Sequence, residues 1–157
     1  MSLQNADKNI QELAKSLKLE IPSILETKMC ALQSEDGMVL HFFYEENGDF
    51  LYLYAPLLTV LPKEDSQKAK LYEELLQAQL LFSGVSDGKI GIDKKQGILF
   101  FYEPLTMKEE GEKVLAEKFP TFFRMSMAWK ELVDKTLGTQ PPKKTQEPVR
   151  PINPIKL

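Results

Sequence analysis

The sequence is poor in the residues that build disulfides and zinc sites. Its 157 residues include one cysteine, Cys30, and one histidine, His41. A lone cysteine cannot form an intrachain disulfide, which fits a reducing compartment. Tetrahedral zinc sites take several cysteine or histidine ligands, so the sequence argues strongly against such a site.

Long apolar runs and an excess of positive charge are missing too. No stretch of about 20 apolar residues occurs, so no membrane-spanning helix is predicted. Residues 1–18 are polar and amphipathic, without the apolar centre of a secretory signal. The net charge of −3 and the pI near 5.3 argue against nucleic-acid binding through bulk positive charge. With 43% hydrophobic and 27% charged residues, the chain is typical of one soluble globular domain.

The sequence contains no catalytic signature: no Walker loop, no GxGxxG, no GxSxG and no HExxH motif. A catalytic thiolate at Cys30 would need a nearby base, and only His41 could supply one. We therefore expect Cys30 to be a buried, inert thiol and His41 to be a structural or surface histidine. Two acidic clusters are interpreted as solvated turn and helix-start residues, not as acid-base pairs: Glu45, Glu46 and Asp49, and Glu109, Glu110 and Glu112.

Helical signals occur in three segments. Apolar residues at i, i+3, i+4 and i+7 predict a first helix over residues 6–18, and they are Ile10, Leu13, Ala14 and Leu17. The last helix is predicted to open at a capping box of Thr106 and Glu109, to be interrupted or kinked at Pro120, and to stop at Gly138. Its apolar stripe consists of Phe122, Met125, Trp129 and Leu132.

The middle helix, predicted from Asp65 to Ser83-Gly84, is apolar around much of its circumference. One stripe consists of Leu71, Leu75, Ala78 and Phe82, and the other of Tyr72, Leu76 and Leu80. A helix with two apolar stripes must be buried on two sides. One side can cover a sheet, and a second subunit is a natural partner for the other.

Five segments rich in strand-forming residues lie between these helices. They span residues 27–32, 38–44, 50–60, 89–92 and 98–102. Asp36-Gly37 and Asn47-Gly48 predict hairpins between the first three. Pro56 cannot donate to a ladder, so it implies an edge, a bulge or a break. The predicted class is α+β: three helices and a twisted, mainly antiparallel five-stranded sheet in the order α-β-β-β-α-β-β-α.

Aromatic residues are concentrated in two Phe-Phe-Tyr triplets, residues 42–44 and 100–102. Strand residues alternate between the two faces, so one aromatic in each triplet points opposite to the other two. Helices can cover one sheet face, whereas less of the chain is left for the other. Both interpretations stay open for these side chains: ordinary core, or a hydrophobic groove for another polypeptide.

The last twenty residues differ in composition from the rest. Residues 138–157 hold half of the ten prolines, and four basic residues against one acidic give this tail a charge of +3. Because the whole chain has a net charge of −3, residues 1–137 carry a net charge of −6. These residues form the predicted folded domain. The proline-rich, mildly basic tail is expected to be extended and flexible. A docking peptide for a partner groove is the other interpretation.

The stretch Leu71–Leu105 resembles the signature region of class I type III secretion chaperones, the Tir-chaperone or CesT-like family. The shared features are a leucine-rich helix with a small residue near its end, a glycine-containing loop, a strand ending in Asp, a turn, and a strand running into Pro-Leu. Here they are Leu75-Leu76, Ala78, Gly84 and Gly88, Ile90–Asp93, Gly97–Phe101 and Pro104-Leu105. Gln79 stands where the family often has Asn. The final helix with Phe123 and Trp129 is also similar, and the element order matches over residues 5–137.

The resemblance implies a cytoplasmic bacterial homodimer that binds the amino-terminal segment of virulence effectors in extended form. It would keep them soluble and export-competent and present them to the secretion ATPase, with a second chaperone as a further candidate partner. No catalytic residue and no cofactor are implied. The implied dimer contacts are Tyr72, Leu76, Leu80 and Ile90. The implied effector contacts on the first helix and the sheet are Ile10, Leu13, Leu17, Met29, Phe42 and Tyr44.

Two other functions are kept open. One is a small α+β enzyme with Cys30 or His41 in its site. The other is a non-catalytic adaptor that uses its tail and its apolar surface to assemble a larger complex. A dimer in solution that co-purifies with an otherwise insoluble protein segment would favour the chaperone over both.

Overall fold

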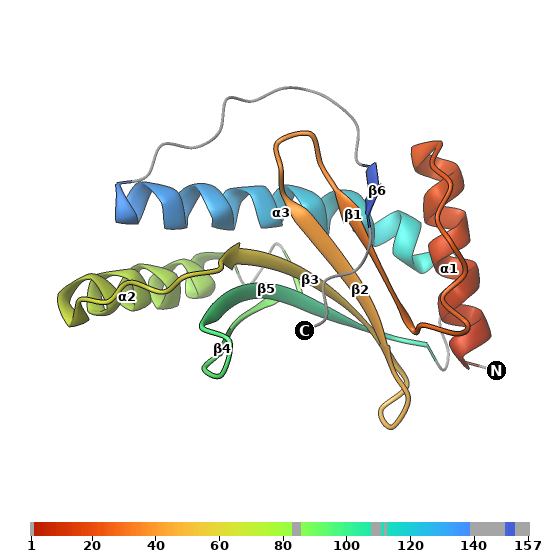
Figure 1. Ribbon diagram of the computed structural model, residues 1–157, viewed down its shortest axis with the longest axis horizontal. Helices are drawn as coiled ribbons and strands as arrows, with labels where there is room; N and C mark the ends of the chain where they lie inside the picture. The colour runs from red at the N-terminus through yellow and green to blue at the C-terminus, as the bar shows by residue number, and fades with distance from the viewer. Residues whose placement is uncertain (1, 83–85, 108–110, 112, 139–149, 153–157) are drawn as a thin grey trace.

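The computed structural model describes residues 2–82, 86–107, 111, 113–138 and 150–152. Three helices and six strands follow one another along these residues (Figure 1). The helices are α1 (Ser2–Leu17), α2 (Asp65–Phe82) and α3 (Val114–Leu137). The strands are β1 (Met29–Gln33), β2 (Val39–Glu45), β3 (Phe50–Leu58), β4 (Lys89–Asp93), β5 (Ile98–Thr106) and β6 (Arg150–Ile152).

All strand pairs are antiparallel, in the spatial order β4-β5-β3-β2-β1-β6. The predicted α+β class, the five strands and the order α-β-β-β-α-β-β-α are confirmed. β6 is an addition to the predicted five strands. It comes from the tail, and its residues pair with the outer edge of β1. The remaining tail residues, 139–149 and 153–157, lie outside the described part of the chain.

The core lies between α3 and one face of the sheet. Phe122 and Phe101 stack with their ring centroids 5.3 Å apart, and Phe119 stacks on Phe42 at 6.1 Å. Trp129 is fully buried and also contacts Phe101. Figure 1 shows α2 alongside one end of α3 and α1 across the other. All three helices therefore contribute to one continuous core.

Several local predictions are confirmed by the structure. The register between β3 and β5 shifts between Pro56 and Leu58, which is the bulge that a donor-less residue favours. Gly138 adopts a left-handed conformation with φ of 71° and donates its N–H to the carbonyl oxygens of Asp134 and Lys135. This glycine ends α3 as predicted. The interruption predicted at Pro120 is wrong, because Pro120 lies inside α3 and the helix continues to Leu137.

The predicted capping box is wrong. Thr106 is the last residue of β5, and α3 begins eight residues later at Val114. Lys113, at the N-cap position, provides no side-chain hydrogen bond to the helix. Instead, the buried Asn9 of α1 accepts the Leu115 N–H through its Oδ1 at 3.0 Å. Its Nδ2 donates to the carbonyl oxygens of Asn5 and Gly111 at 3.0 and 3.1 Å.

Asn9 thus satisfies one of the free N–H groups at the start of α3 from a different helix. We expect Asn9→Ala to lower the free energy of unfolding by about 1–3 kcal/mol, because the Leu115 N–H and the Gly111 carbonyl lose their buried partner. Urea denaturation followed by the fluorescence of Trp129 measures this. The matched control is Gln4→Ala, an exposed residue on the same helix, which should change stability by less than about 0.5 kcal/mol. Equal effects of the two substitutions would contradict the capping role.

Candidate functional site

The two sheet faces are defined by the alternation of side chains along the strands. Phe42, Tyr44 and Phe101 lie on the face that packs against α3 and belong to the core. Phe43, Phe100 and Tyr102 have the opposite phase, so they lie on the other face, called here the outer face. Each aromatic triplet is split as predicted, with one residue opposite to the other two.

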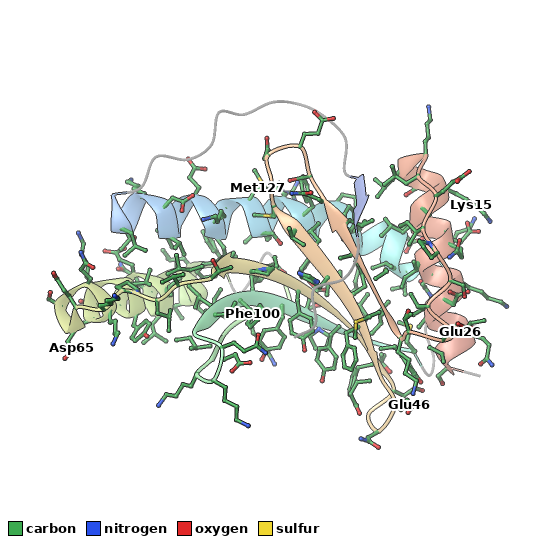
Figure 2. The ribbon with its side chains drawn as sticks, in the orientation of Figure 1. Lys15, Glu26, Glu46, Asp65, Phe100 and Met127 are labelled. Atoms are coloured by element: carbon green, nitrogen blue, oxygen red, sulfur yellow. The ribbon has the colours of Figure 1, made fainter. Side chains whose placement is uncertain are left out.

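The outer face carries a connected row of aromatic rings from β3 and β5. Along β3, the centroids of Phe50 and Tyr52 are 5.9 Å apart, and those of Tyr52 and Tyr54 are 5.7 Å apart. Tyr54 then contacts Tyr102 at 6.0 Å and Phe100 at 5.8 Å across the strand pair; Phe100 is labelled in Figure 2. Most of these rings are half-buried, whereas Phe100 is buried. Within the part of the chain that the structure describes, the ring contacts of this row join its members to one another.

β2 extends this apolar surface towards β1. Phe43 is half-buried on the outer face and lies opposite Tyr52 of β3 on one side and Met29 of β1 on the other. Pro104 of β5 lies opposite Tyr52 in the same cross-strand row. A row from Met29 through Phe43 and Tyr52 to Pro104 therefore crosses four strands. Such a surface suits apolar side chains of an extended polypeptide.

Four of the six predicted effector contacts are in the core. Ile10 and Leu13 of α1 and Phe42 of β2 are each 1% exposed, and Tyr44 is 5% exposed. They pack with α3 and the helix-covered face, so in this structure no partner can reach them. Leu17 and Met29 are only partly buried. On the outer face, the β2 residue between Met29 and Tyr52 is Phe43, whereas Phe42 and Tyr44 lie on the core face.

Tyr44 has a structural role in the core. Its hydroxyl donates to Asp49 Oδ1 at 2.7 Å, and both residues are buried. Burial, together with the Asp49 carboxylate, raises the pKa of Tyr44 to about 12. Glu45, near the same turn, accepts the N–H groups of Asn47 and Gly48. These carboxylates therefore organise the turn between β2 and β3, and the second acidic cluster (Glu109, Glu110 and Glu112) lies outside the described residues.

A second apolar surface lies along α2 and β4. Leu76, Leu80 and Leu81 are 74%, 77% and 70% exposed, and Ile92 of β4 is 40% exposed. The first predicted stripe of α2 is buried at Leu71, Leu75 and Ala78, whereas Leu76 and Leu80 of the second stripe face away from the core. Tyr72 and Ile90 of the predicted dimer contacts are half-buried and pack against the core edge. We call Leu76, Leu80, Leu81 and Ile92 the α2 strip.

The side-chain amide of Gln79 joins α2 to β4 through two hydrogen bonds. Gln79 accepts the Ile90 N–H through its Oε1 at 3.2 Å, and its Nε2 donates to the Gly88 carbonyl at 3.5 Å. The Gln79 amide thus satisfies two backbone groups of the segment entering β4. This contact fixes β4 beside α2, so that Ile92 and the α2 leucines belong to one structural unit.

Cys30 and His41 do not form a catalytic pair. Cys30 lies on the core face, where burial raises the pKa of its thiol to about 12. His41 lies on the other face of the sheet, two residues from Phe43, and is 3% exposed. Within the described residues no group of His, Cys, Asp and Glu is arranged to hold a metal ion. No described helix is both long enough and apolar enough to cross a membrane.

Comparison with known proteins gives one family and several related folds. The model of the Tir chaperone protein (CesT) family matches residues 8–130. Among curated proteins, none matches this sequence. A chain of the HopA1-SchA chaperone-effector complex has 17% identity and a TM-score of 0.62, covering 83% of this chain and 97% of that chain.

Two other complexes contain the same fold. A chain of the ExsC-ExsE complex has 15% identity and a TM-score of 0.63, covering 83% of this chain and 94% of that one. A chain of the heterodimeric ExoU-SpcU complex, from the type III secretion system of Pseudomonas aeruginosa, has 20% identity and a TM-score of 0.58. It covers 78% of this chain and 93% of that one. At these identities the likeness establishes the fold.

The burial of His41 makes stability depend on pH. Its Nε2 is buried without a hydrogen-bond partner among the described residues, and burial lowers the pKa of His41 below the ordinary 6.5. The unfolded chain therefore binds a proton at a higher pH than the folded chain does. The stability contributed by neutral His41 is complete above pH 6.5 and is lost as the pH falls through the folded pKa.

We expect the unfolding free energy of the wild-type chain to fall more steeply below pH 6.5 than that of His41→Gln. Because this is the sole histidine, the difference between the two curves isolates its titration from that of the carboxylates. Urea denaturation of both proteins at equal concentration, from about pH 7.5 to about pH 5, measures the effect. If the unfolding free energies of the two proteins fall equally with pH, the lowered pKa of His41 is contradicted.

Proposed function

Because the chain belongs to the Tir chaperone protein (CesT) family, we propose that it is a type III secretion chaperone. It binds the amino-terminal segment of secreted effector proteins in extended form and keeps them soluble and export-competent. The observation that carries this proposal is the family match over residues 8–130, combined with an apolar outer sheet face. The similar fold of a chain in the HopA1-SchA complex, which is described as a chaperone-effector complex, supports it.

The outer face supplies the driving force that such binding needs. Removing about 1,000 Å² of apolar surface from water contributes roughly 25 kcal/mol before any losses. Ordering an extended segment and immobilising two molecules cancel most of this. The remainder allows tight binding that is still reversible. The aromatic rings accept many apolar side chains, because ring stacking and burial demand no particular sequence.

We also propose that the chain is a homodimer and that the α2 strip forms its interface. Three leucines exposed by 70% or more on one helix are unusual for a surface that faces only water. Tyr72 and Ile90, which border the strip, would become more buried in the dimer. A two-fold axis near α2 would pair the strip with itself, as an isologous interface requires.

The proposed function needs no catalytic group and no cofactor. The partners are effector proteins and the secretion ATPase, with a second chaperone as a further candidate, and the compartment is the bacterial cytoplasm. The acidic folded domain favours basic clients over nucleic acid. For the adaptor alternative, the described part of the tail pairs with the chain's own sheet and so gives it no support.

Affinity purification from the encoding bacterium, followed by mass spectrometry, tests the function. We expect a secreted protein to be recovered, and its binding to be lost when its amino-terminal segment is deleted. Phe43→Glu should weaken that binding at least about tenfold, because a buried unpaired carboxylate costs more than about 1.4 kcal/mol. Leu25→Glu, at an exposed apolar residue outside the sheet, is the control and should bind normally. Recovery of no secreted protein, or equal binding by both variants, would refute the proposal.

Leu80→Glu tests the dimer interface. We expect the wild-type protein to have a molecular mass in solution of twice 18.0 kDa, and the variant to have a mass of 18.0 kDa. The reason is that a two-fold interface brings two introduced carboxylates together in an apolar contact. Sedimentation equilibrium measures the mass, and Leu25→Glu should remain dimeric. A monomeric wild-type chain at micromolar concentration would rule the interface out.

A further inference from the structure

The outer edge of β1 presents its backbone groups in a phase that the structure fixes. The Ser34 N–H donates to the Met38 carbonyl, and the Tyr44 N–H donates to the Lys28 carbonyl, both at 2.8 Å. Residues 28 and 34 therefore point their backbone groups at β2. Since these groups alternate along a strand, those of Met29, Ala31 and Gln33 point to the opposite edge. β1 pairs with β2 in one regular register, so this phase holds along the whole strand.

β6 occupies this edge in the matching phase. Gln33 lies opposite Arg150, Leu32 opposite Pro151 and Ala31 opposite Ile152. Arg150 and Ile152 thus face the outward groups of β1, whereas Pro151 stands at the position whose own N–H would point away. A proline there removes no bond to β1. It also leaves the new edge without a donor, which hinders the addition of a further strand.

The composition of the tail limits how long this pairing can be. Pro148 and Pro154 lie two residues before Arg150 and two residues after Ile152. If the register of β6 were extended in both directions, each would take the phase that faces β1, where a proline cannot donate to the ladder. Position 154 is also the one that would oppose Met29 if the register continued. In that extended register the tail would pair fully with Ala31 and Gln33 but not with Met29.

The edge that β6 fills is continuous with the outer face. Met29, at the end of β1, lies directly opposite Phe43. A foreign strand in the place of β6 would set every second side chain beside β1 residues of the outer face. Without proline at the Met29 position it would also form a longer ladder than the tail can. A foreign strand could therefore displace β6 by gaining both backbone bonds and apolar contacts.

We propose that β6 is a built-in competitor: the carboxy-terminal tail fills the strand-accepting edge of β1 until a strand of the client displaces it. This regulation rests on the proposed chaperone function. The tail is tethered, so it rebinds without diffusion and keeps the edge filled when no client is present. It also shields an exposed strand edge from pairing with other chains. If the edge is filled about nine-tenths of the time, the client binds about tenfold more weakly than it would to a free edge.

Two single substitutions in the full chain separate pairing from side-chain loss. Ile152→Pro removes a backbone N–H that points at β1. Pro151→Ala changes the neighbouring residue, whose backbone groups point away from β1. A fluorescent peptide with the wild-type sequence of residues 146–157 is the probe. We expect it to bind the Ile152→Pro chain about tenfold more tightly than the wild-type and Pro151→Ala chains. Equal binding to all three chains overturns the proposal.

Amide hydrogen exchange followed by NMR locates the effect on β1. In Ile152→Pro the outward amides of Ala31 and Gln33 should exchange at least about tenfold faster than in the other two chains. The amide of Leu32, which faces β2, should keep its protection and serves as the control within the same strand. Unchanged exchange of Ala31 and Gln33 shows that β6 does not cover this edge, which also overturns the proposal.

The client recovered by purification tests the regulatory step. Its affinity should rise in Ile152→Pro by the same factor as that of the peptide and stay at the wild-type value in Pro151→Ala. If the affinity of the peptide rises in Ile152→Pro but the affinity of the client does not change, the client does not bind at this edge. That result refutes the competition. The peptide and exchange measurements use no effector, so their outcome stands even if the chaperone function fails.

Discussion

The packing of α3 against one sheet face is the constraint on which the rest of the structure depends. Phe122 on Phe101, Phe119 on Phe42 and the buried Trp129 bind this helix to the central strands. α1 and α2 pack against α3, so all three helices are used on the same side. The outer face must then be covered by something else or remain partly open. An apolar surface for partners is therefore a consequence of how a short chain distributes its helices.

Features encoded by neighbouring residues could be predicted from the sequence. The hairpin at Asp36-Gly37 forms, with Gly37 at a φ of 83°, because a turn with positive φ depends on the residues within it. Gly138 and Pro56 have the same kind of local meaning, one as a helix stop and one as a bulge. The two stripes of α2 follow from helical spacing: the structure buries Leu71, Leu75 and Ala78 of one and leaves Leu76 and Leu80 of the other exposed. Element order follows from the sum of such signals.

Features that depend on residues distant in the sequence could not be predicted in this way. Alternation shows that Phe42 and Phe43 face opposite sides, but only the position of α3 decides which side is the core. Asn9 and Leu115 are separated by 106 positions. The sequence around Asn9 gives no signal for which distant backbone group its side chain binds. β6 is three residues long and contains a proline, so strand propensity gives it no signal. Its existence depends on the free edge of β1.

A secretion chaperone has to hold its client firmly and still release it, and the two apolar surfaces and the edge have different parts in this. The α2 strip is rich in leucine and lies on a rigid helix, which suits a lasting interface between identical chains. The outer face and the edge of β1 meet at Met29 and Phe43, so a client can bind both at once. Each contact alone is modest, and release can then begin by peeling one end of the strand from the edge. In the proposed competition, a tethered tail that rebinds the vacated edge would make each step of that peeling harder to reverse. In the proposed competition, firm holding and easy release both depend on the short ladder at the edge of β1.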